Sequence, residues 1–153
     1  FKDISPLLSS PDFPQVIKDM GKLVQKPDYW VGIDARGFLF AGALSYEFGG
    51  GVIMCRKKGK LPADTFSQDF VLEYGKSTIE IHKDSINKND AVVIIDDLIA
   101  TGGTAEAAAK LVEKSGGKVT GFIFVINLYD VGGIKKLKDK GYKALSLIEF
   151  PGH

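Results

Sequence analysis

Residues 92–104 read Val92-Val93-Ile94-Ile95-Asp96-Asp97-Leu98-Ile99-Ala100-Thr101-Gly102-Gly103-Thr104. The four consecutive β-branched residues predict a strand that is buried on both faces, as a central strand of a parallel sheet is. This strand ends at two carboxylates. A short loop of Gly and Thr then enters an alanine-rich amphipathic helix predicted for residues 104–112, which Thr101 or Thr104 can cap.

The loop at residues 100–104 has the chemistry of an anion site. Backbone N–H groups at a helix N-terminus lack intrahelical partners and lie at the positive end of the helix dipole. The two glycines carry no side chain that would exclude a ligand, and the two threonine hydroxyls add donors, so the loop predicts a phosphate site. Asp96 and Asp97 are too acidic to share it, and we expect them to face hydroxyl groups or a metal.

Local chemistry alone leaves an alternative open, namely an ordinary strand-to-helix turn with solvated aspartates and a threonine cap. Two other nucleotide loops do not fit. Gly75-Lys76-Ser77 has Phe70 where the first glycine of a P-loop belongs, and no G-x-G-x-x-G pattern occurs.

A phosphate on one side and vicinal hydroxyls on the other describe a ribose 5-phosphate. The stretch strongly resembles the 5-phosphoribosyl-1-pyrophosphate (PRPP) motif of the type I phosphoribosyltransferase family. The resemblance implies that Asp96 and Asp97 bind the ribose hydroxyls. It also implies that the 5-phosphate is bound by Ala100, Thr101, Gly102, Gly103 and Thr104.

Composition bounds the class of protein. With 153 residues, 44% apolar and 25% charged, the chain matches an average globular protein, and we expect a single domain over residues 1–153. A net charge of +1 argues against a nucleic-acid binder held by general electrostatics. The single cysteine, Cys55, cannot form an internal disulfide, which favours the cytoplasm. No apolar run is long enough to span a membrane. The chain begins at Phe1 rather than methionine, so a native N-terminal segment is expected to precede it.

Periodicity predicts the other elements. Together they form an α/β domain with a mainly parallel sheet, helices on both faces and a small flexible hood without periodicity at residues 61–70. We expect helices opened at residues 10–12, following residues 34–38, and at 131–140. We expect strands at residues 29–33, 52–54, 72–75, 79–82, 119–126 and 144–150, with a turn at residues 76–77.

Asp34-Ala35-Arg36-Gly37-Phe38 repeats the order of strand end, carboxylate, glycine and helix start. Its helix N-terminus predicts a second anion site, and an arginine can fork onto phosphate oxygens. The pentapeptide resembles the pyrophosphate loop of the adenine-specific branch of the family. This implies pyrophosphate binding by Asp34, Ala35, Arg36 and Gly37. A surface ion pair between Asp34 and Arg36 is the alternative.

The run Arg56-Lys57-Lys58-Gly59-Lys60-Leu61-Pro62 is basic. A solvated loop is the ordinary explanation. However, the only two arginines of the chain lie in these two loops, and the run resembles the segment that opens a mobile hood over the active site in the family. The resemblance implies pyrophosphate contacts by Arg56, Lys57 and Lys60, in the same subunit or across a homodimer.

Three further segments resemble family elements around the base. Phe1 would stack on the purine, the backbone of Lys2 would read its edge, and Leu128 would pack against it. Glu73, in Leu72-Glu73-Tyr74-Gly75, would accept the proton that the purine nitrogen loses or stabilise charge at C1 of the sugar. An exposed glutamate on a hairpin is the alternative. The resemblance thus implies Glu73, Arg36 and Arg56 as catalytic residues.

The base itself can be argued physically. A 6-oxo purine needs a donor such as lysine, and no lysine or arginine lies between Lys118 and Lys135, where the sequence places the wall of the base site. The pocket therefore favours adenine. Asn127 departs from the family pattern, which usually has glutamate there, so the contacts at that edge are open.

The resemblance runs from Phe1 to Leu128 through five motifs in family order. It implies transfer of the phosphoribosyl group from PRPP to adenine, giving AMP and pyrophosphate in purine salvage. Mg²⁺ would be held mainly by the substrate and water rather than by the protein. Two alternatives remain: a regulator that senses PRPP without catalysis, and the same reaction with hypoxanthine or xanthine.

Overall fold

A computed structural model describes residues 3–72 and 75–152. The helices of this part are α1 (Ser5–Leu8), α2 (Phe13–Lys22), α3 (Arg36–Phe48), α4 (Gly103–Lys114) and α5 (Gly133–Asp139). The strands are β1 (Tyr29–Ile33), β2 (Gly51–Lys57), β3 (Thr65–Leu72), β4 (Gly75–His82), β5 (Ala91–Ile99), β6 (Lys118–Leu128) and β7 (Ala144–Phe150).

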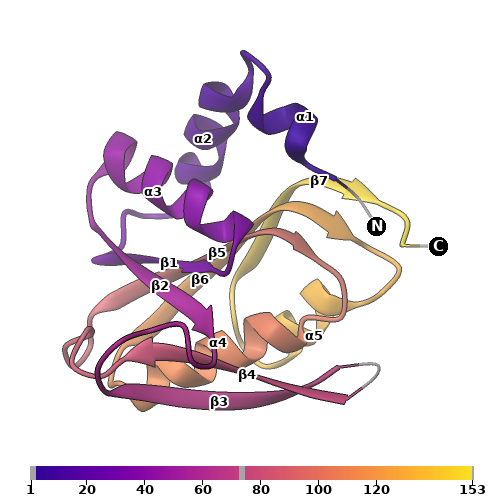
Figure 1. Cartoon of the computed structure of the whole chain (residues 1–153). Coiled ribbons are helices and arrows are strands. Elements are labelled where there is room, and N and C mark those ends of the chain that lie inside the picture. Colours follow the sequence, from indigo (N-terminus) through magenta and orange to yellow (C-terminus); the bar gives the residue numbers. More distant parts are fainter. Residues whose placement is uncertain (1–2, 73–74, 153) are drawn as a thin grey trace.

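The described residues form a seven-stranded sheet in the order β3-β4-β2-β1-β5-β6-β7. The five strands from β2 to β7 in this order are parallel to one another, whereas β4 pairs antiparallel with both β2 and β3. Helices α2 and α3 cover one face, and α4 and α5 cover the other (Figure 1). The predicted α/β fold with a mainly parallel sheet is confirmed, and β5 lies near its centre.

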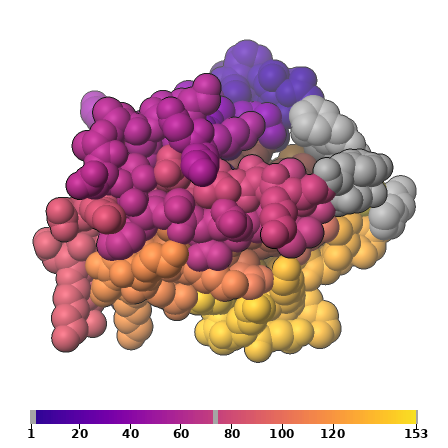
Figure 2. All heavy atoms as spheres, turned by 60° about the horizontal axis from the view of Figure 1, so that its bottom comes forward, coloured from indigo at the N-terminus to yellow at the C-terminus, as the bar shows by residue number. Residues whose placement is uncertain are grey.

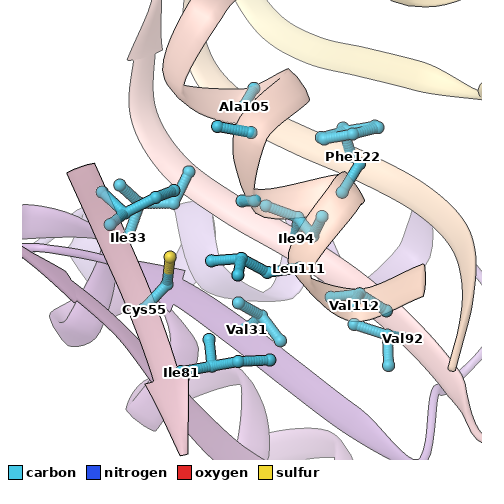
Figure 3. Close-up of a cluster of buried hydrophobic side chains, with 14 of the residues drawn as sticks. Val31, Ile33, Cys55, Ile81, Val92, Ile94, Ala105, Leu111, Val112 and Phe122 are labelled. Atoms are coloured by element: carbon cyan, nitrogen blue, oxygen red, sulfur yellow. The ribbon is translucent and has the colours of Figure 1, made fainter. Parts of the chain in front are cut away.

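The alternation of β5 side chains explains the run of four β-branched residues. Val92 and Ile94 pack toward α4, whereas Val93 and Ile95 pack toward α2 and α3, and all four are fully buried. Successive strand residues point to opposite faces, so both faces of a central strand must be apolar. Figure 3 shows the α4 side of this core, with Val92 and Ile94 beside residues of α4 and β6.

The hood is the part of the fold that was predicted least well. Residues 65–70, expected to lack periodicity, belong to β3, which pairs antiparallel with β4 along its whole length. The turn predicted at Lys76-Ser77 is wrong, because these residues pair with Val71 and Phe70 inside the ladder. One face of the hairpin packs on the core through Ile79 and Ile81, and its other face carries polar cross-strand pairs, such as Thr78 Oγ1 donating to Asp69 Oδ1 at 2.6 Å.

The hairpin packs along the face of the molecule that carries α4. Lys114, at the C-terminus of α4, donates from Nζ to the carbonyl oxygen of Ser67 at 2.9 Å. In the space-filling view the magenta and pink atoms of this part of the chain lie next to the orange atoms of the α4 region (Figure 2). The hairpin thereby closes one side of the region beyond the carboxyl ends of β1 and β5.

Three further features of the fold concern the start of α4, the start of the chain and the length of the helices. Gly102, in a left-handed conformation with φ 85°, is the N-cap residue of α4, and no side chain in the described part of the chain accepts a hydrogen bond from the helix start, so the threonine cap predicted from the sequence is wrong. The chain start forms the short helix α1, while Phe1 and Lys2 lie outside the described residues. Among the residues that the structure describes, no helix is long and apolar enough to cross a membrane.

Candidate active site

The junction between β5 and α4 encloses a cavity of about 210 Å³. Its lining is Asp96, Leu98, Ile99, Ala100, Thr101, Gly102, Gly103, Thr104, Ala105 and Phe124. No side chain of the described residues caps the N-terminus of α4, so backbone donors of its first turn are available to a ligand. The five loop residues predicted to bind phosphate therefore share one cavity, with a carboxylate at its edge.

The two adjacent aspartates face different surroundings. Asp96 lines this cavity and a second one of about 290 Å³, whereas the Asp97 carboxylate is 4% exposed and lines neither. Asp97 Oδ2 accepts a hydrogen bond from Arg36 Nε at 2.5 Å. Of the two aspartates predicted to bind the ribose, Asp96 therefore faces the cavities, and Asp97 is hydrogen-bonded to Arg36.

Burial and neighbouring charges shift the pKa values of Asp96 and Arg36. Burial raises the pKa of Asp96 well above its usual range, and the negative charge of Asp97 raises it further. The pKa of Arg36 is raised by its hydrogen bond and ion pair with Asp97. The second arginine pair is looser, with Arg56 Nε 3.5 Å from Asp34 Oδ2.

The loop between β1 and α3 lies close to the loop after β5. A Cβ atom on Gly37 would lie 2.7 Å from the carbonyl oxygen of Ile95 and 3.3 Å from Asp96 Oδ1. Only glycine permits this approach. The peptide bond between Asp34 and Ala35 is cis. The order of the two loops along the chain gave no sign that the arginine of one would pair with a carboxylate of the other.

The second cavity joins three parts of the chain. Asp34 and Lys57 line it from β1 and β2, Asp96 and Thr104 line it from the β5–α4 junction, and the hairpin closes it. The other lining residues are Ile33, Phe70, Leu72, Ser77 and Ile79. The hairpin residues were not identified from the sequence. Their signal is the two-residue spacing of Phe70 and Leu72 on one face of β3.

Arg56 and Lys60 differ in how they approach this region. The Arg56 guanidinium lies 5.6 Å from the centroid of the Phe38 ring, at the start of α3. Lys57 donates its backbone N–H to Asp34 Oδ2 at 3.4 Å. Lys60 is exposed on the loop after β2 and lines neither cavity. Of the four basic residues predicted to bind pyrophosphate, Lys57 thus lines the second cavity, while Arg36 and Arg56 pair with Asp97 and Asp34 and line neither cavity.

The residues expected around the base are only partly described. Leu128, at the end of β6, is partly buried against the core on the α3 side of the sheet. Asn127 is 6% exposed, and within the described structure its Oδ1 atom has no hydrogen-bond partner. Phe1, Lys2 and Glu73 lie outside the described residues.

A protein-built metal centre is not found in residues 3–72 and 75–152. In this part of the chain no group of three or more His, Cys, Asp or Glu side chains could hold a metal ion. Asp96 is the carboxylate that faces both cavities. A hard cation could thus gain one protein oxygen here but would need its other ligands from substrate and water.

Known proteins are similar to this chain in sequence and in fold. The adenine phosphoribosyltransferase of Pelagibacter ubique (strain HTCC1062) is 55% identical over 156 residues, covering 100% of this chain and 89% of that protein. The crystal structure of adenine phosphoribosyltransferase from Thermoanaerobacter pseudethanolicus ATCC 33223 matches with a TM-score of 0.93 and 47% identity, covering 98% of this chain and 88% of that one. The APRTase of Giardia lamblia complexed with 9-deazaadenine matches with a TM-score of 0.91 and 33% identity, covering 98% and 86%.

The family comparison gives the same result. The model of the phosphoribosyl transferase domain matches residues 15–152. The match includes both loops that carry the arginine and carboxylate pairs, and it agrees with the resemblance inferred from the motifs. This chain therefore belongs to the phosphoribosyltransferase family and has the type I fold of that family.

Proposed function

We propose that this chain transfers the 5-phosphoribosyl group of PRPP to adenine, with the loop at residues 100–104 as the 5-phosphate site. The observation that carries the proposal is the cavity at the β5–α4 junction, where an uncapped helix N-terminus and the carboxylate of Asp96 meet. The similar proteins are adenine phosphoribosyltransferases, and this chain covers 89% of the length of the relative at 55% identity. The reaction is adenine phosphoribosyl transfer of purine salvage.

In the reaction, N9 of adenine forms a bond to C1 of the ribose while the bond from C1 to the pyrophosphate oxygen breaks. N9 loses its proton, for which Glu73 is the proposed acceptor. The transition state has oxocarbenium character. Donors and charges placed at the departing pyrophosphate therefore stabilise it more than they stabilise the bound substrate.

The ribose and pyrophosphate sites are linked through Asp97. Asp96 faces the cavities and is the first proposed contact for the ribose hydroxyls. Asp97 can join it only when its hydrogen bond with Arg36 is exchanged. We propose that this exchange turns Arg36 toward the pyrophosphate.

The remaining pyrophosphate contacts come from both sides of the second cavity. Asp34 and Lys57 line it at the end formed by β1 and β2, and Arg56 Nε lies 3.5 Å from Asp34 Oδ2. Backbone groups of Ala35 and Gly37, at the start of α3, are the further proposed contacts. Lys60 would reach this end only by movement of the loop that carries it. Closure of the hood would exclude water that could otherwise attack the sugar.

Mg²⁺ is the proposed cofactor. Enzymes of this family generally use PRPP with Mg²⁺. Asp96 could supply a protein oxygen, either directly or through water, and the ion would neutralise charge on the pyrophosphate.

Adenine is the proposed base. The physical argument is the lack of a basic residue between Lys118 and Lys135, which disfavours a 6-oxo purine. Leu128 is the proposed apolar contact, with Phe1 stacking on the ring and the backbone of Lys2 reading its edge. The complex of the Giardia lamblia relative with 9-deazaadenine supports an adenine-shaped site.

A homodimer in the cytoplasm is proposed from the family resemblance. The α3 and β2 surface supports a dimer, since Leu39, Tyr46, Val52 and Met54 are exposed there and Tyr46 is 92% exposed. Exposed apolar side chains that gather on one surface are typical of interaction sites. Sedimentation velocity tests this: we expect a dimer that Tyr46→Glu weakens. A monomeric wild-type protein would contradict the proposal.

The test of function is an assay of pyrophosphate release with PRPP and each of adenine, hypoxanthine and xanthine. We expect release with adenine and Mg²⁺, with AMP as the second product. Preference for a 6-oxo purine would contradict the base assignment. Binding of PRPP without turnover with any base would favour a regulator.

A further inference from the structure

Helix α5 begins directly against the loop at residues 100–104. A Cβ atom on Gly133 would overlap the carbonyl oxygen of Ala100 and would lie 2.7 Å from Ile99 Cγ1. From the other side, a Cβ atom on Gly102 would lie 3.3 Å from both Cα and the carbonyl oxygen of Gly133. The loop and the start of α5 are therefore in contact through backbone atoms, with no side chain between them.

A buried carboxylate fastens α5 to the helix that the loop begins. Glu106 lies in the first turn of α4 and its side chain is 13% exposed. Its carboxylate oxygens lie 3.2 Å from Lys136 Nζ and 2.8 Å from Lys140 Nζ, both on or at the end of α5. Lys110, one turn further along α4, lies 3.6 Å away. Three lysines on two helices thus converge on one carboxylate.

The charge of Glu106 would oppose a phosphate at the same helix end. An acidic side chain in the first turn stabilises a helix, but it repels an anionic ligand placed at that N-terminus. The lysines offset this charge, and the two that lie nearest to the carboxylate, Lys136 and Lys140, belong to α5 and its end. The arrangement is therefore better explained by fixing α5 against α4 than by attracting phosphate.

We infer that α5 is the positioning element of the phosphate loop: Gly133 sets the distance between helix and loop, and Glu106 holds the helix there through Lys136 and Lys140. This inference rests on the proposed function, since it concerns the site of the PRPP 5-phosphate. Gly133 and Glu106 act through the loop and are positioning residues. The loop amides are in place before the substrate arrives. A small displacement of the loop through α5 can therefore change binding, even though α5 is far from the chemistry.

The first test is Gly133→Ala, with Gly141→Ala as its control. Gly141 lies at the other end of α5, has φ 92° and has no atom within 4 Å of an added Cβ, so alanine there strains the backbone without touching the loop. We expect Gly133→Ala to raise the KM for PRPP at least about tenfold while the KM for adenine stays within about twofold. Gly141→Ala should change neither KM, although it lowers the melting temperature.

Ribose 5-phosphate titration by calorimetry gives a second readout that needs no turnover. Weaker binding in Gly133→Ala than in Gly141→Ala supports the inference. Equal binding in the two variants, or equal rises in both KM values, overturns it. If the wild-type protein bound ribose 5-phosphate but formed no AMP, the proposed function would fail while the titration still tested the role of α5.

The second variant, Glu106→Gln, distinguishes positioning from simple charge. Removing a negative charge beside a phosphate site should lower the KM for PRPP if Glu106 acts only through its charge. Loss of the attachment of α5 should instead raise it, by about threefold to tenfold, with the KM for adenine unchanged. An unchanged or lowered KM for PRPP in a folded Glu106→Gln protein would overturn the inference.

Discussion

The two junctions between a strand and a helix in the site have the same order of residues but different chemistry. In both, carboxylates precede a glycine near the start of a helix, but the predicted strand end at Asp96 and Asp97 is wrong, because β5 continues to Ile99. Asp34 follows β1, and Gly37 lies in the first turn of α3.

At β5–α4 the loop is open to a cavity and carries no cationic side chain. At β1–α3 two cationic side chains are present, and both are paired with carboxylates. Arg36 pairs with Asp97, and Arg56 of the neighbouring strand β2 pairs with Asp34.

The difference indicates two ways of binding an anion. Backbone donors fixed by the fold cost no rearrangement when the ligand arrives, and a single phosphate can dock on them at once. Paired arginines must first exchange a carboxylate for the ligand, so they respond to what binds next to them. In our proposal the 5-phosphate uses the first kind of site and the pyrophosphate uses the second.

The largest effect is expected when both adjacent aspartates of β5 lose their charge. Asp96→Asn with Asp97→Asn should lower kcat by at least about 10³-fold, because both the ribose contacts and the exchange with Arg36 are lost. A thermal melt checks that the double variant still folds, and pyrophosphate release measures its rate. Wild-type turnover in the folded variant would refute the ribose assignment.

The arginines should differ from one another. Arg36 is bound to a buried carboxylate at 2.5 Å, whereas Arg56 meets Asp34 at 3.5 Å and lies over Phe38. We expect Arg36→Ala to lower kcat/KM for PRPP by about 10²-fold, and Arg56→Ala by about tenfold. Steady-state kinetics with varied PRPP measures both. A larger loss for Arg56→Ala would mean that the exchange of Asp97 is not the central event.

A smaller effect tests the open junction. Thr104 lines both cavities, and its hydroxyl is one donor among several backbone donors. Thr104→Val keeps the shape of the side chain and removes the hydroxyl, so the KM for PRPP should rise by about fivefold to tenfold. Thr78→Val, on the hairpin, is the matched control and should leave that KM unchanged. If the two variants behaved alike, the phosphate would not be bound at this loop.

The smallest expected effect concerns stability rather than rate. Burial raises the pKa of Asp96, so the folded protein binds more protons there than the unfolded chain does, and its free energy of unfolding falls as pH rises. The window runs from about pH 4, the pKa of an unfolded aspartate, up to the raised pKa.

Asp96→Asn removes this dependence. Its stability relative to the ligand-free wild-type protein should therefore increase with pH across the window and become constant above it. Urea unfolding at several pH values measures the difference. A difference that stays constant from pH 4 upward would show that Asp96 is not destabilised by burial.

Sequence patterns predicted what is local along the chain. The strands expected at residues 29–33 and 144–150 have those bounds in the structure. The first is almost wholly buried, and the second is an edge strand whose apolar residues still mark it in the sequence. Residues 100–104 share one cavity, as their nearness in sequence predicts, but the expectation that Asp96 is too acidic to share it is wrong, because Asp96 lines the same cavity. In contrast, the pair Arg36–Asp97 joins the start of α3 to β5, and the pair Arg56–Asp34 joins β2 to the turn after β1. These residues are distant in the chain, and no local pattern could reveal the pairs.

The bounds of the hairpin and the contact of α5 with the phosphate loop were not predicted, although a hairpin near residues 72–82 and a helix at residues 131–140 were expected. The apolar residues of β3 are interspersed with polar ones such as Ser67 and Asp69, and the cross-strand pairing that extends the hairpin links residues distant in sequence. The contact of Gly133 with the loop depends on how α5 returns to the sheet, a tertiary property. The roles of Phe1, Lys2 and Glu73 stay predictions.

The most direct test of the central proposal is a crystal structure with AMP bound. We predict that the phosphate lies in the cavity at residues 100–104, with its oxygens accepting hydrogen bonds from backbone N–H groups of the loop, and that the ribose hydroxyls face Asp96. A structure in which that loop is empty and the AMP phosphate lies elsewhere would contradict the account.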